Sequence, residues 1–306
     1  MIRPTGNEPT CTVSEDAEGI DTIISARTRD IGGFNVGRVL PAIGRRMVGP
    51  FIFFDHMGPG DFEPGQGLDV RPHPHINLAT VTYLFEGEIH HRDSLGSSLA
   101  IRPGAINWMT AGRGIVHSER SGDEARARGG RLHGIQLWVA LPRKLEEVEP
   151  SFRHHPAESI PGRKIDEVEV RVLAGEAYGL RSPVRGLSRL FYVEAKIPRG
   201  AELVLPDNYP ERAAYVVSGA VVCERAIVRE RNMMVFGEGE EIRLRAKEDA
   251  HLMLVGGDPL DGPRHVYWNF VSSRPERIEE AKAAWRDHAF PPVPGDEEER
   301  IPLPDA

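Results

Sequence analysis

The sequence predicts an all-β protein, of sandwich or barrel type, in which one unit occurs twice in tandem. Three observations support this prediction. Short β-rich runs recur along the 306 residues and are separated by glycine, proline and aspartate, with 32 glycines and 25 prolines in all. Two stretches of the first half resemble two stretches of the second half in the same order. Neither a GxGxxG motif nor a phosphate-binding loop is present, which disfavours alternating strands and helices.

The expected strands fall into two series. The first series occupies 37–41, 51–57, 78–89, 97–104, 106–112, 114–119 and 132–142. The second occupies 169–179, 190–198, 201–206, 212–222, 232–246 and 250–257. Residues 151–158 (SFRHHPAE) are typical of a linker. We therefore expect one domain over residues 1–145 and a second over residues 146–306, in line with about 150 residues per domain.

The two series carry the marks of a duplication. Thr82–Ile89 (TYLFEGEI) and Ala214–Val221 (AYVVSGAV) each have a tyrosine, a glycine four residues later and then an aliphatic residue. His133–Pro142 and Ala250–Pro259 likewise resemble each other as a final strand that ends in a turn. Two matches in the same order favour a tandem repeat.

One helix is expected, near the C-terminus, over residues 273–288. Ser273 is a candidate N-cap with Glu276 in the capping-box position, and Ile278, Ala281 and Trp285 form an apolar stripe. Such a stripe predicts a helix that packs on a sheet.

Charge and composition exclude several classes of protein. Lysine and arginine number 38 and aspartate and glutamate 46, a net charge of −8 without a basic block, so we expect no direct binding to nucleic acid. The chain has two cysteines far apart, no apolar leader and no apolar run of membrane-spanning length. These features predict a cytoplasmic protein that does not enter a membrane, and we expect a monomer.

Two pairs of residues have the spacing of metal ligands. His73 and His75 are two apart, as are His117 and Glu119, and in a strand such residues point to the same face. If the two strands face each other inside a barrel, three imidazoles and one carboxylate converge. The competing interpretation is a scatter of surface or core histidines, because the chain has 12 of them. The adjacent His90 and His91 are expected to lie in solvent.

A four-ligand set of this kind leaves open positions on a six-coordinate ion. Such mixed nitrogen and oxygen sites suit Fe(II), Mn, Ni or Cu(II) better than structural zinc. We expect one divalent transition metal, Fe(II) before the others. The second half has no comparable pair, so its unit is expected to be free of metal.

Several stretches resemble the pirin family of the cupin superfamily. They are FFDHMGP (53–59), HPH, ATVTYLFEG, DSLG, RPGAINWMTAGRGIVHSE, IQLWVALP and the terminal FPPVPGD and IPLP. The resemblance spans most of the chain and implies a bicupin, with two tandem cupin-type β-barrels, a metal site in the first barrel and a C-terminal helix. It also implies His73, His75, His117 and Glu119 as the metal ligands. The sequence departs from the family where Ile76 and Asn77 replace a basic residue and a glycine.

The resemblance implies two functions. One is an oxygen-dependent, ring-cleaving dioxygenase acting on flavonols such as quercetin, with Glu119 as a catalytic residue and a small aromatic substrate. Phe51, Phe53, Trp108 and Met109 are candidates for a planar substrate pocket, with core packing as the alternative. The other function is a non-enzymatic, metal-dependent regulator that binds a transcription factor or a partner enzyme. Fold and ligands are common to both, so sequence alone does not separate them.

Overall fold

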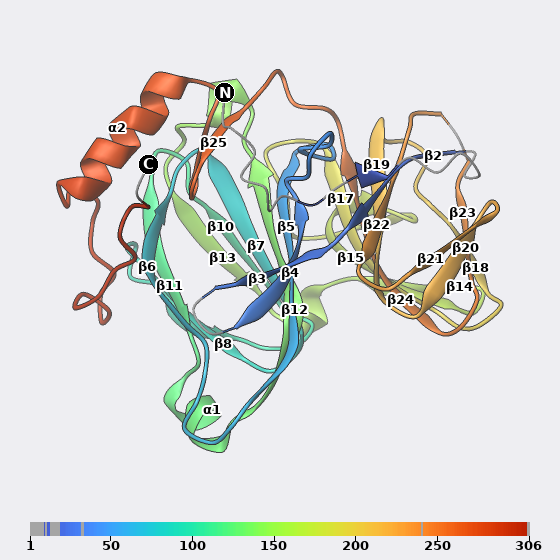
Figure 1. Cartoon of the computed structure of the whole chain (residues 1–306), viewed down its shortest axis with the longest axis horizontal. Coiled ribbons are helices and arrows are strands. Elements are labelled where there is room, and N and C mark those ends of the chain that lie inside the picture. Colours follow the sequence, from blue (N-terminus) through green and yellow to red (C-terminus); the bar gives the residue numbers. More distant parts are fainter. Residues whose placement is uncertain (1–8, 10, 13–18, 32–33, 240, 305–306) are drawn as a thin grey trace.

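The chain forms two β-barrels side by side in a computed structural model that describes residue 9 and residues 11–12, 19–31, 34–239 and 241–304 (Figure 1). Two helices are described, α1 (Asp123–Arg128) and α2 (Pro275–Arg286), and strands dominate the rest. The predicted all-β architecture with a C-terminal helix is therefore confirmed. Neither helix is both long and apolar enough to cross a lipid bilayer.

Two sheets form the first barrel and pack through a shared cluster that includes Val36, Leu84 and Ile101. The larger sheet has the strand order β13 (Ser151–His155), β10 (Ile106–Thr110), β7 (Leu78–Glu86), β12 (Gly130–Ala140), β5 (Phe51–Phe62), β4 (Asn35–Leu40) and β3 (Arg27–Asp30). The smaller sheet has the order β6 (Asp69–His75), β11 (Ile115–Arg120), β8 (Ile89–Asp93) and β9 (Ser98–Ile101).

The second barrel has the same two-sheet plan. Its larger sheet runs β1 (Cys11–Thr12), β2 (Ile20–Ser25), β22 (Asn232–Phe236), β19 (Glu211–Ser218), β24 (Ala250–Gly257), β17 (Leu190–Ile197), β15 (Val168–Ala177) and β14 (Gly162–Ile165), with β16 (Leu180–Arg181) beside β15. Its smaller sheet runs β18 (Glu202–Val204), β23 (Arg243–Ala246), β20 (Ala220–Cys223) and β21 (Ala226–Arg229). A hairpin of β25 (His265–Tyr267) and β26 (Phe270–Ser272) precedes α2.

Each barrel takes strands from the other half of the chain. Strand β2 pairs with β22 of the second barrel, and β13 pairs with β10 of the first. The segment 151–158 is thus not a plain linker, because its first five residues complete the first sheet. The domain division after residue 145 stays a prediction, since the exchange ties the two barrels together.

The repeat in the sequence corresponds to a repeat in the structure. Tyr83 lies in β7 and Tyr215 in β19, and each strand pairs with the last long strand of its own barrel, β12 or β24. Gly87 and Gly219 follow these strands with φ angles of 87° and 79°, a backbone region that glycine adopts without steric cost. Both matched glycines therefore turn the chain into the next strand.

The two barrels share one continuous apolar core. Phe51, Phe54 and Trp108 from the first barrel pack with Tyr192 and Tyr215 from the second in one buried cluster. The outer face of each large sheet is therefore covered by the other barrel, which explains why strands such as β7 are buried on both faces.

Helix α2 covers the first barrel, on the left of Figure 1. Its stripe Ile278, Ala281 and Trp285 packs with Ile76 and Val116, as the apolar pattern predicted. The predicted N-cap was wrong. Arg274 occupies the N-cap position without a side-chain cap, because the Ser273 hydroxyl instead donates a hydrogen bond to Glu146.

Candidate metal centre

Three of the four predicted ligands come together inside the first barrel. Strands β6 and β11 are antiparallel neighbours, with His117 opposite His73 and Ile115 opposite His75. One ring nitrogen from each of His73, His75 and His117 lies within 4.8 Å of those of the other two. All three side chains are buried, at 6%, 1% and 1% exposure. The i, i+2 spacing thus places both β6 histidines on the face where His117 projects.

The hydrogen bonds of this triad leave nitrogens free to bind a metal. His73 Nδ1 donates to the Arg71 carbonyl oxygen at 2.9 Å, and His75 Nδ1 donates to the Asn269 carbonyl oxygen at 3.1 Å. A carbonyl only accepts, so Nδ1 carries the proton in both rings and Nε2 retains its lone pair. Among the described residues, neither nitrogen of buried His117 has a partner.

Burial keeps these imidazoles neutral. Loss of hydration lowers the pKa of His73 to about 4 and holds the pKa values of His75 and His117 well below the usual range, with mutual repulsion as a further cause. Neutral imidazole is the form that ligates metal ions. Three converging donors with free lone pairs fit a divalent transition metal.

Glu119 lies on the same wall of the barrel, but its carboxylate is not part of the triad. It sits opposite His91 of β8, and a register shift in the β6–β11 pairing falls between His117 and Glu119. Thr82 and Gln136 donate hydrogen bonds to its carboxylate at 3.3 and 3.4 Å. Burial raises the pKa of Glu119. Its place as the fourth ligand stays a prediction.

The four candidate pocket residues occupy two different clusters. Phe53 stacks on Trp138 with ring centroids 4.1 Å apart, and Trp138 meets the His75 ring edge-on at 5.0 Å. Met109 packs in the same cluster. Phe51 and Trp108 instead lie in the core between the barrels. The structure therefore brings Phe53 and Met109 to the triad's side of the sheet and places Phe51 and Trp108 in the inter-barrel core.

The prediction for His91 was wrong. His91 is 3% exposed, stacks on Phe152 at 4.2 Å and lies 5.4 Å from the His117 ring. Its Nε2 lies 2.9 Å from Asp93 Oδ2, whose carboxylate is fully buried. His90 points the other way, toward Ser98. The missed signal was the same i, i+2 spacing between His91 and Asp93 that identified the other two pairs.

Asn77 explains one departure from the family pattern. Its φ angle is 58°, in the left-handed region that asparagine tolerates better than most residues other than glycine. It is fully buried, and its amide donates to the Glu146 carbonyl oxygen at 2.6 Å. Asparagine is therefore compatible with the left-handed backbone at this position.

The interior of the second barrel differs in chemistry from the first. Its cluster consists of apolar side chains such as Val193, Val216, Leu244 and Leu252. In the first barrel, the corresponding space holds the triad together with polar residues such as Thr82 and Gln136. Among the described residues, the cluster of three histidines thus belongs to the first barrel.

Comparisons with known proteins give consistent results. The family model described as Pirin matches residues 33–139, and that described as Pirin C-terminal cupin domain matches residues 192–291. A pirin-like protein of Caulobacter vibrioides is 51% identical over 290 residues, covering 94% of this chain and 100% of that protein. A Pseudomonas aeruginosa protein, named provisionally as a quercetin 2,3-dioxygenase, is 37% identical over 267 residues and covers 86% of this chain and 83% of its own length. The crystal structure of a quercetin 2,3-dioxygenase from Acinetobacter baumannii matches with a TM-score of 0.87 at 34% identity, covering 94% of this chain and 96% of that one.

Proposed function

Because this chain belongs to the pirin family of the cupin superfamily, we propose that it is a metal-dependent dioxygenase that opens the ring of a flavonol such as quercetin. One family match lies in each barrel, so the bicupin fold is confirmed. The observation that carries the proposal is the buried triad of neutral histidines, in which His117 finds no hydrogen-bond partner in the part of the chain that the structure describes. The names of two similar proteins support the reaction class.

The chain's own residues would hold one divalent transition metal. His73, His75 and His117 supply three imidazole nitrogens, and Glu119 is proposed as the fourth ligand. Fe(II) is preferred, with Mn, Ni or Cu as the other ions that suit such a donor set. When bound, the ion supplies Lewis acidity and redox chemistry toward dioxygen.

Side chains around the triad would bind and orient the substrate. Phe53 and Trp138 form a stacked aromatic wall beside His75, which suits a planar ring system. Thr82 and Gln136 hold the Glu119 carboxylate by hydrogen bonds. Glu119 is also proposed as a base toward the flavonol hydroxyl, a role that its carboxylate would fill less well while it ligates the ion.

Aerobic turnover of a flavonol panel tests the proposal. Protein loaded with Fe, Mn, Ni or Cu should consume dioxygen and flavonol together, and the anaerobic sample should be inactive.

Metal analysis should give one ion per chain, lost in His75→Ala. Two ions per chain, or full metal content in that variant, would contradict the assignment of the site. Metal binding without turnover of any flavonol would overturn the dioxygenase and favour the regulator that binds a protein partner.

Glu119→Gln separates the role of the carboxylate from that of the histidines. The substitution removes one negative charge with little change in shape, so the ion would carry about one more unit of positive charge. We expect lower metal occupancy and, after metal is restored, turnover lower by about tenfold or more, equivalent to ~1.4 kcal/mol in barrier. Elemental analysis and steady-state kinetics measure the two effects, and unchanged turnover would exclude Glu119 from the reaction.

A further inference from the structure

The hairpin β25–β26 brings its tip to the candidate metal centre. Its strands pair His265 with Ser272 and Tyr267 with Phe270, so Trp268 and Asn269 form the turn. The fully buried Phe270 makes a parallel bridge with Ile76, next to His75. At the turn, the Asn269 carbonyl accepts the 3.1 Å hydrogen bond from His75 Nδ1. One metal ligand is thus oriented by a segment 194 residues away in the chain.

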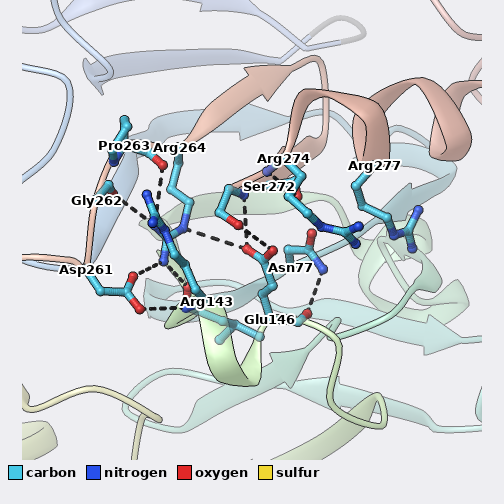
Figure 2. A network of polar contacts seen from close by, with 12 residues as sticks. Asn77, Arg143, Glu146, Asp261, Gly262, Pro263, Arg264, Ser272, Arg274 and Arg277 are labelled. Atoms are coloured by element: carbon cyan, nitrogen blue, oxygen red, sulfur yellow. Dashed lines mark hydrogen bonds and ion pairs between the residues drawn. The ribbon is translucent and has the colours of Figure 1, made fainter.

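The base of the same hairpin is held by one buried carboxylate, that of Glu146. Glu146 is 3% exposed and accepts hydrogen bonds from the Ser273 hydroxyl at 2.7 Å and the Ser273 backbone N–H at 3.0 Å. On the opposite strand of the base, Arg264 Nε lies 4.0 Å from the Glu146 carboxylate (Figure 2). Both ends of the hairpin therefore meet at Glu146.

Arg264 is itself fixed in place. Its guanidinium donates to the Leu141 carbonyl at 2.6 Å and to Asp261 Oδ1 at 2.7 Å, and its side chain is fully buried (Figure 2). Because Glu146 directly follows the short turn that ends β12, these bonds attach the hairpin base to the first barrel. The turn at Trp268 and Asn269 is therefore connected through short strands to a base that is fixed on the first barrel.

We propose that Glu146 is a positioning residue for the metal ligand His75. By fixing the hairpin base it holds the Asn269 carbonyl in place, and that carbonyl sets the tautomer and ring orientation of His75. The Asn269 carbonyl is bonded directly to the ligand, and loss of such a partner typically lowers metal affinity by about 10–100-fold, so displacement of this carbonyl sets the size of the effect expected from Glu146. The inference rests on the proposed metal centre but not on the dioxygenase reaction.

Cobalt(II) binding to the full-length protein tests this role. In Glu146→Gln the side chain keeps its shape but can no longer accept both bonds from Ser273. We expect its Co(II) affinity, measured by chelator competition, to fall by about tenfold or more, with a shift in the visible absorption of the bound ion. In Ser273→Ala, which keeps the backbone hydrogen bond to Glu146, the Co(II) affinity should fall by a smaller factor.

Glu194→Gln is the matched control. Glu194 is also buried, at 5% exposure, and its carboxylate also has two hydrogen-bond partners, Tyr83 and His251, but it does not touch the hairpin. We expect this variant to lose thermal stability while binding Co(II) as the parent protein does.

The outcomes separate this inference from the proposed function. Equal Co(II) affinity in Glu146→Gln and the parent, or an equal loss in Glu194→Gln, would overturn the positioning role while leaving the metal centre intact. Failure of the parent protein to bind Co(II) would overturn both. Loss of flavonol turnover alone would not bear on Glu146, because the readout is metal affinity.

Discussion

At the scale of single residues, His117 differs from His75 in its hydrogen bonding. Both ring nitrogens of His117 are buried and lack a partner among the described residues, whereas His75 Nδ1 donates a hydrogen bond to the Asn269 carbonyl. A buried polar group without a partner costs roughly 1–3 kcal/mol. A metal ion would convert this cost into binding free energy, so function and stability of the metal-free protein are opposed at this position.

The two histidines should therefore respond differently to the same substitution. In metal-free protein, His117→Phe removes an unpaired polar group and should leave the free energy of unfolding unchanged or higher. His75→Phe leaves a buried carbonyl without its donor and should lower that free energy by about 1–3 kcal/mol. Urea unfolding in the presence of a chelator measures both. A larger loss in His117→Phe than in His75→Phe would contradict this account, and both variants should lose metal.

His90 and His91 offer a second comparison between neighbours. His91 is buried against Phe152 and Asp93, whereas His90 is partly exposed and reaches Ser98. His91→Leu should lower the free energy of unfolding by about 1–3 kcal/mol, because Asp93 Oδ2 loses its donor while Asp93 Oδ1 keeps the backbone N–H groups of Leu95 and Ser97. His90→Gln should change it by less than about 0.5 kcal/mol. Equal effects in denaturant titrations would show that the burial difference is not energetically relevant.

At the scale of elements, the repeated turns depend on glycine. Gly219 has a φ angle of 79°, and a Cβ there would lie 2.2 Å from the Asp249 carbonyl oxygen. The equivalent Gly87 would meet the Arg131 carbonyl oxygen at 2.5 Å. Each position therefore combines a left-handed backbone with close approach of the neighbouring strand, and either barrel would have to open locally to accept a side chain.

Alanine substitution separates these two contributions. Gly200 has a φ angle of 87° but no atom within 4 Å of a built Cβ, so Gly200→Ala should cost only the left-handed strain, about 1–2 kcal/mol. Gly219→Ala and Gly87→Ala should cost more, because backbone oxygens must move as well. Thermal and urea unfolding measure the difference, and equal losses at all three positions would mean that the close contacts relax without cost.

At the scale of the whole molecule, a polar network crosses the shared core. His56 of the first barrel bonds Tyr215 of the second at 2.8 Å through Nδ1 and His133 at 2.7 Å through Nε2. Burial is the main cause that lowers the pKa of His56 to about 3, and His133, Arg231 and His251 lower it further. The contact between the barrels therefore requires neutral His56.

This shift predicts a loss of stability in acid. An unfolded histidine has a pKa near 6.5, so between about pH 6.5 and pH 3 the unfolded chain binds a proton that the folded chain does not. The stabilisation is complete above pH 6.5 and declines as the pH falls through this window. His56→Gln should flatten the dependence of the unfolding free energy on pH between 7 and 4.5. The histidines of the metal centre contribute equally to the parent protein and to His56→Gln, so their effect cancels in the comparison. An unchanged slope of unfolding free energy against pH in His56→Gln would show that a group other than His56 causes the loss of stability in acid.

Much of this architecture was predictable because local patterns decide it. The runs of β-forming residues, the two Tyr-to-Gly turns and the stripe on α2 all depend on neighbours in sequence, and the structure confirms them. The two i, i+2 pairs predicted that His73, His75, His117 and Glu119 converge if their strands face each other, and the three histidines do come together. The strand exchange was not predictable, because pairing partners of β2 and β13 lie far away in the chain.

The sequence by itself therefore determined the all-β class and the duplication, and it put His73 and His75 on one strand face through the alternation that backbone geometry enforces. Only the tertiary structure decided which faces are buried between the barrels. Phe51 and Trp108 therefore lie in the shared core, and His91 lies beside His117 and not in solvent. It also decided that Ser273 bonds Glu146 rather than capping α2 and that the Asn269 carbonyl orients His75. The last two contacts join residues 127 and 194 positions apart, and no local propensity encodes which distant groups meet when the barrels close.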